Sequence, residues 1–159
     1  MKRFSVSWDY IASFIDAEGC ISYIPYNQVD KRNNRYYGIR CQVYVGQKLE
    51  QSYVIDLISK KLNDSGINNC VTVDRKIGKN RTCRMKYLRV QNHNCILKLF
   101  KFIIPRLIVK QDIAKEMEDT ILAKNWQKWG ELNIDWNNTK EKSNYNRKYL
   151  ERKRRYKHE

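Results

Sequence analysis

Two acidic residues end an apolar segment near the start of the chain, in the stretch IASFIDAEGC (residues 11–20). Asp16 and Glu18 follow apolar residues at helical spacing, with Ser7 as a candidate N-cap and Gly19 as a typical helix stop. Ionised carboxylates are rarely buried unless they are paired or bind a metal. The end of this predicted helix is therefore the first candidate for chemistry, and its oxygen ligands suit a hard metal ion.

Other classes of active site lack the residues they need. The chain of 159 residues has two histidines, His93 and His158. Zinc fingers, His-metal nuclease sites and Ser/His or Cys/His nucleophile systems are therefore incomplete. The nucleotide-binding patterns G-x-x-x-x-G-K-[ST] and G-x-G-x-x-G are absent. Five cysteines without a Cys-x-x-Cys pair are expected to be reduced and mostly buried: Cys20, Cys41, Cys70, Cys83 and Cys95.

The charge of the chain points to a polyanionic partner. Lys and Arg number 32 and Asp and Glu 17, a formal net charge of +15. Residues 139–159 contain nine Lys or Arg and three Glu, which suits either a phosphate-binding arm or a solvated tail. No apolar run is long enough for a membrane span, so a soluble, intracellular protein without a membrane partner is expected.

The hydrophobic pattern predicts an α+β domain over residues 1–138, followed by the basic C-terminal tail 139–159. The expected elements are a helix from about Trp8, strands 20–28 and 35–47, a helix 49–63, strands 68–76 and 81–91, and helices 95–104 and 110–129. The order is α-ββ-α-ββ-α-α. Each pair of strands reads as an antiparallel hairpin, and the loop of the first contains VDKRNN.

Each strand has one apolar and one polar side, because side chains alternate with a period of two. In the second strand, the inward residues are Ile39, Cys41, Val43 and Val45. In the second hairpin, Val71, Val73, Met85 and Tyr87 are expected inward, with Arg75 or Lys76, Arg84, Lys86 and Arg89 outward. One face of the sheet would thus be the core, and the other would be basic and aromatic.

The segment IASFIDAEG resembles the signature L-A-G-[LF]-[IV]-D-[AG]-[DE]-G of the LAGLIDADG homing endonucleases. Ala12 and residues 14–19 match, whereas Ile11 and Ser13 replace Leu and Gly. The expected order of elements is also that of this fold, so the resemblance extends over nearly the whole chain. It implies a site-specific DNA endonuclease, built as a four-stranded antiparallel DNA-binding saddle backed by helices.

The resemblance also implies a homodimer, because the motif occurs once and two such helices pack side by side in this family. The residues implied at the contact are Ile11, Ala12, Ser13 and Asp16. Two half-sites imply double-stranded DNA of roughly 20 base pairs with a near-palindromic sequence.

Catalysis, by the same resemblance, depends on the carboxylate of Glu18 and the backbone carbonyl of Ala17 as ligands of Mg²⁺, with Mn²⁺ or Ca²⁺ as other occupants. Gln47 matches a position that orients solvent, and Lys110 matches a lysine at the edge of the active site. Each subunit would hydrolyse one phosphodiester across the central minor groove. An arginine often found just after the Gln position is absent, which leaves Lys48 as the nearby cation.

DNA contacts are expected from the outward strand residues and the basic loops. The candidates are Ser22, Tyr26, Gln28, Lys31, Arg32, Arg35, Arg40, Gln42, Tyr44, Arg75, Lys76, Arg84 and Lys86. Two rival hypotheses remain open. The first is a non-cleaving nucleic-acid-binding protein of the same fold, such as an intron RNA maturase, which would bind intron RNA and leave DNA uncut. The second is a transcriptional regulator or a basic ribosome-associated domain, which predicts that Glu18→Gln is tolerated.

Overall fold

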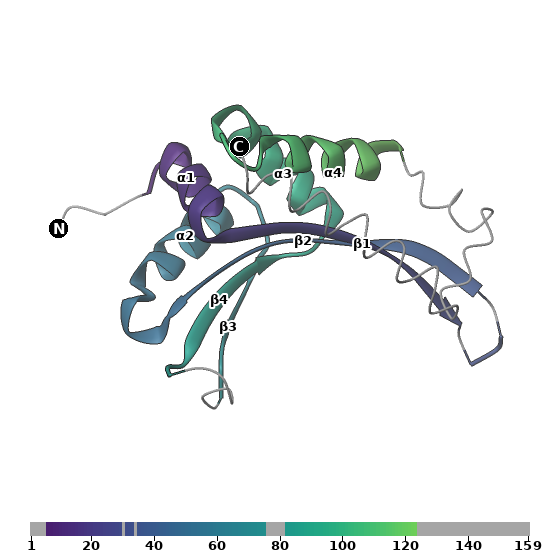
Figure 1. Ribbon diagram of the computed structural model, residues 1–159, viewed down its shortest axis with the longest axis horizontal. Helices are drawn as coiled ribbons and strands as arrows, with labels where there is room; N and C mark the ends of the chain where they lie inside the picture. Colours follow the sequence, from purple (N-terminus) through teal and green to yellow (C-terminus); the bar gives the residue numbers. More distant parts are fainter. Residues whose placement is uncertain (1–5, 30, 34, 76–81, 124–159) are drawn as a thin grey trace. The chain divides into compact units, whose positions relative to one another are not determined.

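The computed structural model describes residues 6–29, 31–33, 35–75 and 82–123 (Figure 1). The chain divides into two compact units, and the first contains the four α-helices of the described residues. Its described residues are 6–24, 39–75 and 82–123, and those of the second unit are 25–29, 31–33 and 35–38. The basic tail and the expected end of the last helix lie outside the described residues.

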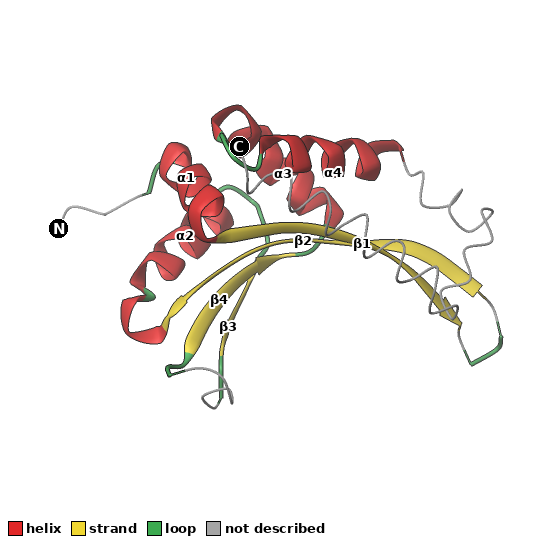
Figure 2. Ribbon diagram, viewed as in Figure 1, coloured by secondary structure: helices red, strands yellow, loops and turns green. Residues whose placement is uncertain are grey.

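The order of elements confirms the predicted α+β class (Figure 2). Along the chain these are α1 (Trp8–Glu18), β1 (Gly19–Val29), β2 (Arg35–Lys48), the 3₁₀ turn η1 (Leu49–Gln51), α2 (Tyr53–Asp64), β3 (Cys70–Val73), β4 (Met85–Val90), α3 (His93–Ile103), η2 (Ile104–Arg106) and α4 (Gln111–Ala123). The strands form one sheet in the order β1-β2-β4-β3, in which β4 pairs antiparallel with both β2 and β3.

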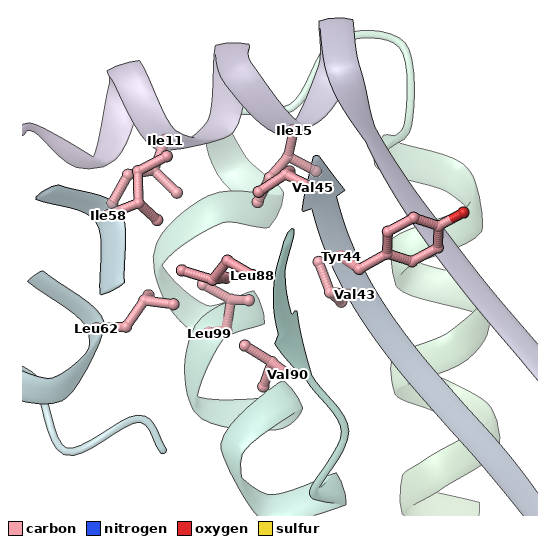
Figure 3. A pocket seen from close by; sticks show the side chains of 10 residues that line it. All are labelled: Ile11, Ile15, Val43, Tyr44, Val45, Ile58, Leu62, Leu88, Val90 and Leu99. Carbon is pink, nitrogen blue, oxygen red and sulfur yellow. The ribbon is translucent and has the colours of Figure 1, made fainter. Parts of the chain in front are cut away.

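Within the first unit the helices cover one face of the sheet and leave the other face open (Figure 1). Apolar side chains from α1, α2 and α3 meet those of β2 and β4 in the core (Figure 3). The members seen there include Ile11, Ile15, Ile58, Leu62, Leu99, Val43, Val45, Leu88 and Val90. The side chain of Tyr44 points away from this cluster, as alternation along β2 requires.

The helix boundaries follow from local chemistry. The hydroxyl of Ser7 accepts a hydrogen bond from the Tyr10 N–H at 3.1 Å, which caps α1 as predicted. The Asn92 side chain caps α3 in the same way through the Cys95 N–H. The expected helix 49–63 instead begins with the turn η1, and α2 starts at Tyr53.

In β4 the expectation that Met85 and Tyr87 face the core is wrong. Leu88 and Val90 are the buried residues of this strand, 4% and 1% exposed, and they define its helix-facing side. Alternation puts Lys86 on that side as well, so its expected outward position is also wrong. Met85, Tyr87 and the outward Arg89 belong to the open face.

The position of Lys86 has a clear electrostatic reason. Its Nζ lies 2.5 Å from Oδ1 of Asp56, which belongs to α2, so the ammonium group is neutralised against the helix layer. Val71 and Val73 of β3 lie opposite Leu88 and Lys86 and therefore share the helix-facing side, as expected. They remain 36% and 38% exposed at the edge of the sheet.

The cysteines are all free. Cys41 and Cys95 are buried, Cys20 and Cys83 are half-buried, and Cys70 is exposed, so fewer cysteines are buried than expected. Burial raises the pKa of the Cys41 thiol to about 12, which keeps it protonated at neutral pH. Within the described ranges, no helix combines the length and the apolar character needed to cross a membrane.

The open face contains one glycine whose missing side chain is required. Gly46 lies opposite Tyr87, and a Cβ at residue 46 would be 2.7 Å from Cδ1 of the tyrosine ring. We expect Gly46→Ala to lower the free energy of unfolding by about 1–3 kcal/mol, because it overpacks this contact. In a Tyr87→Ala background the same change should cost less, and urea denaturation of the four proteins measures the coupling. Equal costs in both backgrounds would contradict the contact.

Candidate functional site

The motif helix passes directly into the first strand. α1 ends at Glu18 and β1 begins at Gly19, without an intervening loop. A Cβ at residue 19 would lie 2.7 Å from the carbonyl oxygen of Ile15, a backbone atom that cannot move aside. Only glycine fits this close approach, and the Glu18 side chain is left exposed at the junction of helix and strand.

The two carboxylates of the motif have different environments. Asp16 is half-buried, and its carboxylate accepts hydrogen bonds from two backbone N–H groups, that of Ile108 at 2.6 Å and that of Lys110 at 2.9 Å. Asp16 therefore fastens the end of α1 to the segment that precedes α4. Glu18, in contrast, has no hydrogen bond or ion pair with any residue that the structure describes.

Of the other two predicted catalytic residues, the structure brings one to the end of α1. The ammonium group of Lys110 donates a hydrogen bond to the backbone carbonyl of Asp16, where the negative end of the helix dipole favours a cation. Gln47 lies near the end of β2, opposite Lys86. Among the described residues, no hydrogen bond joins Gln47 to Glu18 or Lys110.

The exposed face of α1 differs from the predicted contact face. Ile11 and Ala12 are both 0% exposed, because they pack into the core of their own chain, so neither offers side-chain surface to a second copy. Ser13 is exposed, as a contact residue must be. The outer stripe of α1 is formed by residues at helical spacing, namely Tyr10, Ser13, Phe14 and Ala17, with the rings of Tyr10 and Phe14 stacked at 6.1 Å.

The predicted DNA contacts in the first unit occupy several environments. Arg40 on the open face is exposed, as are Arg75 and Arg84, although the Arg84 Nε donates to the Asp74 carbonyl at 2.8 Å. Tyr44 is half-buried on the same face as Arg40. Ser22, expected to be accessible, is 7% exposed and accepts a hydrogen bond from Gln42 Nε2 at 3.1 Å. Lys86 lies on the helix-facing side.

The second unit contains the remaining described candidates. Tyr26, Lys31 and Arg32 are exposed, and Gln28 and Arg35 lie within β1 and β2. Asn33, in the loop between these strands, has a positive φ of 67°, which asparagine tolerates better than most residues. Lys76 lies outside the described residues.

Three ion pairs between described residues involve the helix layer. Arg106 pairs with Asp9, Lys60 with Asp64 and Lys86 with Asp56. On the open face, Arg40, Lys48 and Arg89 have no ion pair with a described residue. Arg89 was placed outward by the sequence but was not a candidate contact. The signal that could have selected it is its position between Leu88 and Val90, whose burial forces it to the open side.

A second group that sequence reasoning missed lies beside Asp16. Ile108 and Val109 are 88% and 61% exposed, although an apolar run before Lys110 normally indicates burial. They belong to the segment whose backbone Asp16 holds. Ile108 and Val109 therefore add exposed apolar surface near α1.

The attachment of this segment can be tested through Asp16. Asp16→Asn should lower the free energy of unfolding by about 1.5–3 kcal/mol, because hydrogen bonds to a charged acceptor are the stronger ones. Asp64→Asn is the matched control: its carboxylate belongs to an exposed pair within α2, which contributes at most about 0.5 kcal/mol. Urea denaturation measures both variants, and an Asp16 variant no less stable than the control would disprove the anchoring role.

Comparison with solved structures gives strong likenesses. The homing endonuclease I-CvuI, in complex with the I-CreI target, aligns with a TM-score of 0.56 and 23% identity over 72% of this chain and 65% of that chain. The LAGLIDADG homing endonuclease I-GzeII, in complex with a DNA target, aligns with a TM-score of 0.55 and 16% identity over 77% of this chain and 38% of that chain. The group I intron-encoded homing endonuclease I-CeuI, complexed with DNA, aligns with a TM-score of 0.53 and 11% identity over 85% of this chain and 63% of that chain.

The aligned part therefore spans less than two thirds of each of these three chains. No protein-family model matches the sequence, and a search of curated proteins finds no match. The structural likeness agrees with the element order, with the sheet order and with the helix that ends at Glu18. This chain has the fold of the LAGLIDADG homing endonucleases.

Proposed function

We propose that this chain is a site-specific, metal-dependent DNA endonuclease that acts as a homodimer. The observation that carries the proposal is the exposed Glu18 at the end of the motif helix, joined without a loop to the first strand of a sheet with an open face. A carboxylate in that position would lie next to the surface on which the duplex rests. Several solved proteins of this fold are complexes with DNA.

The donor set at this position fits a cation shared with a DNA phosphate. The described residues contain no group of three or more His, Cys, Asp or Glu able to hold a metal. Mg²⁺, however, is commonly bound through one or two carboxylates together with substrate phosphates. Glu18 and the carbonyl of Ala17 would be the ligands from this chain, because the oxygens of Asp16 are engaged by backbone N–H groups.

Lys110 and Gln47 would help to orient the substrate and water. When bound, the cation supplies Lewis-acid polarisation of the phosphate and stabilises the charge on the leaving 3′ oxygen. Lys110, held at the end of α1 by its bond to the Asp16 carbonyl, retains two N–H donors that can bind a phosphate oxygen. Gln47, near the end of β2, can order a water molecule through its amide.

The dimer is supported by the surface of α1. Its outer stripe combines the exposed ring of Tyr10 and the half-buried ring of Phe14 with the small residues Ser13 and Ala17, which are four positions apart and allow a second helix to approach closely. Exposed Ile108 and Val109 add apolar surface beside it. Two copies related by a two-fold axis would bring both Glu18 carboxylates to one duplex, one for each strand.

Cleavage is the direct test of the catalytic assignment. Wild-type protein should cut sites selected from a randomised near-palindromic DNA library in Mg²⁺, with paired ends that flank a two-fold centre. Glu18→Gln should lose at least about 100-fold in cleavage rate while it still binds the selected DNA, since only the charged ligand is removed. Circular dichroism checks that the variant is folded, and EDTA should abolish cutting by the wild type.

The same assay separates the rival hypotheses. Wild-type protein that leaves all DNA uncut but binds intron RNA tightly would favour a maturase. Equal cutting by the Glu18 variant would refute the role of this carboxylate. Uncut DNA bound at a defined sequence would indicate a regulator of the same fold.

The dimer makes a separate prediction at Ser13. Ser13→Trp should abolish close packing of two α1 helices, so light scattering should give the 19.2 kDa mass of one chain instead of twice that value. Lys60→Trp, on the exposed surface of α2, is the control and should remain dimeric. A wild-type protein that is monomeric both free and on DNA would rule the dimer out.

A further inference from the structure

Arg89 lies in the interior of the open face. β4 has β2 on one side and β3 on the other, and the register puts Arg89 directly opposite Tyr44 on β2 and Cys70 on β3. Residues opposite each other in an antiparallel pair share a face. Figure 3 shows Tyr44 pointing away from the apolar core, so Arg89 also projects to the side without helices.

The guanidinium of Arg89 is partly enclosed but lacks a partner. Its Nε is the one buried side-chain nitrogen or oxygen without a hydrogen bond in the described part of the chain. The two terminal nitrogens are not buried in this way and form no hydrogen bond with a described residue. No described carboxylate pairs with Arg89. A half-buried cation of this kind is costly unless something binds it.

The position of Arg89 on an interior strand favours contact with base edges over contact with phosphates. The major groove is about 12 Å wide and admits a two-stranded ribbon, and strands lie about 4.8 Å apart. Side chains from interior strands therefore face the floor of the groove, where the base edges are. The sugar-phosphate backbones flank the groove and lie nearer the outer strands.

Guanine is the base that matches the free end of this side chain. With Nε enclosed, Arg89 presents its two terminal nitrogens end-on, as parallel donors. Guanine offers the acceptors O6 and N7 side by side in the major groove, and a bidentate arginine contact to them is the commonest specific pairing. Adenine has an amino donor in place of O6 and would oppose the guanidinium.

We propose that Arg89 is a specificity determinant that reads one guanine in each half-site. This inference rests on the proposed function, because it needs duplex DNA on the open face. Tyr44, directly opposite, would form one wall of the space into which the guanine edge fits. Arg89 would then contribute to the choice of target and would not take part in hydrolysis.

The test compares base preferences of bound DNA, without cleavage. Full-length wild type, Arg89→Gln and Arg89→Lys are each incubated in EDTA with a randomised duplex library, and the bound DNA is sequenced. Wild type should prefer guanine at one position per half-site by about 5- to 150-fold, the usual range for a bidentate contact. Arg89→Gln should lose that preference, or shift it to adenine, with all other positions unchanged.

Two further variants separate charge from geometry. Arg89→Lys keeps the charge but loses the planar pair of donors, so its guanine preference should fall. Lys60→Gln removes one positive charge from the helix layer and should keep the wild-type profile. Thermal unfolding of each variant checks that it is folded.

The outcomes are distinct. An unchanged profile with uniformly weaker binding and a smaller salt dependence in Arg89→Gln would mean a phosphate contact and would overturn the inference. Wild-type protein that selects no sequence at all would overturn the proposed function, and this inference with it. Loss of preference at a single position in both half-sites would support it.

Discussion

The carboxylate of Asp16 holds the candidate site together. It binds the backbone of a segment more than ninety residues away in the sequence, and Lys110 of that segment donates back to the carbonyl of Asp16. At the other end of α1, Asp9 pairs with Arg106 of η2 at 3.0 Å. Both ends of the helix are thus fixed to the segment between α3 and α4. The direction of α1, and with it the place of Glu18, is set by these polar contacts as well as by core packing.

The motif itself has a physical explanation in this chain. Ile11, Ala12 and Ile15 are buried, so the helix must lie on the sheet with this stripe inward. Gly19 is demanded by the backbone of Ile15, because the strand begins where the helix ends. The residue before that glycine then has no core to enter and remains exposed. The fold tolerates an acidic residue there, and that residue can take part in chemistry only when a group from outside the chain, such as a cation, binds to it.

The sequence predicted local structure well and long-range partners poorly. Ser7, Gly19 and the loop residues 31–33 act through neighbours in the chain, and their elements were placed within a few residues. The prediction of which face of β4 is buried was wrong, because MKYLRV contains two apolar stripes of similar character. One is Met85 with Tyr87, and the other is Leu88 with Val90. The choice depends on Asp56, thirty residues from Lys86, and on the helices above Leu88. No local pattern contains that information.

For the candidate site the same limit applies. Glu18 could be singled out from the sequence because an exposed acid after an apolar stripe is unusual, whereas the proximity of Lys110 followed only from the resemblance. The burial of Ser22 and Ala12 was missed because small residues suit both a core and a surface. Their environment is decided by the neighbours that happen to cover them.

The distribution of ion pairs gives the open face its electrostatic character. The pairs of Lys60, Lys86 and Arg106 with carboxylates cancel charge on the helix layer. The four described α-helices together contain more Asp and Glu than Lys, whereas Arg40, Lys48 and Arg89 on the open face have no ion pair with a described residue. A high net charge alone would attract a polyanion to any surface. Cations without a carboxylate partner on the open face favour a polyanion there, where side chains can reach base edges.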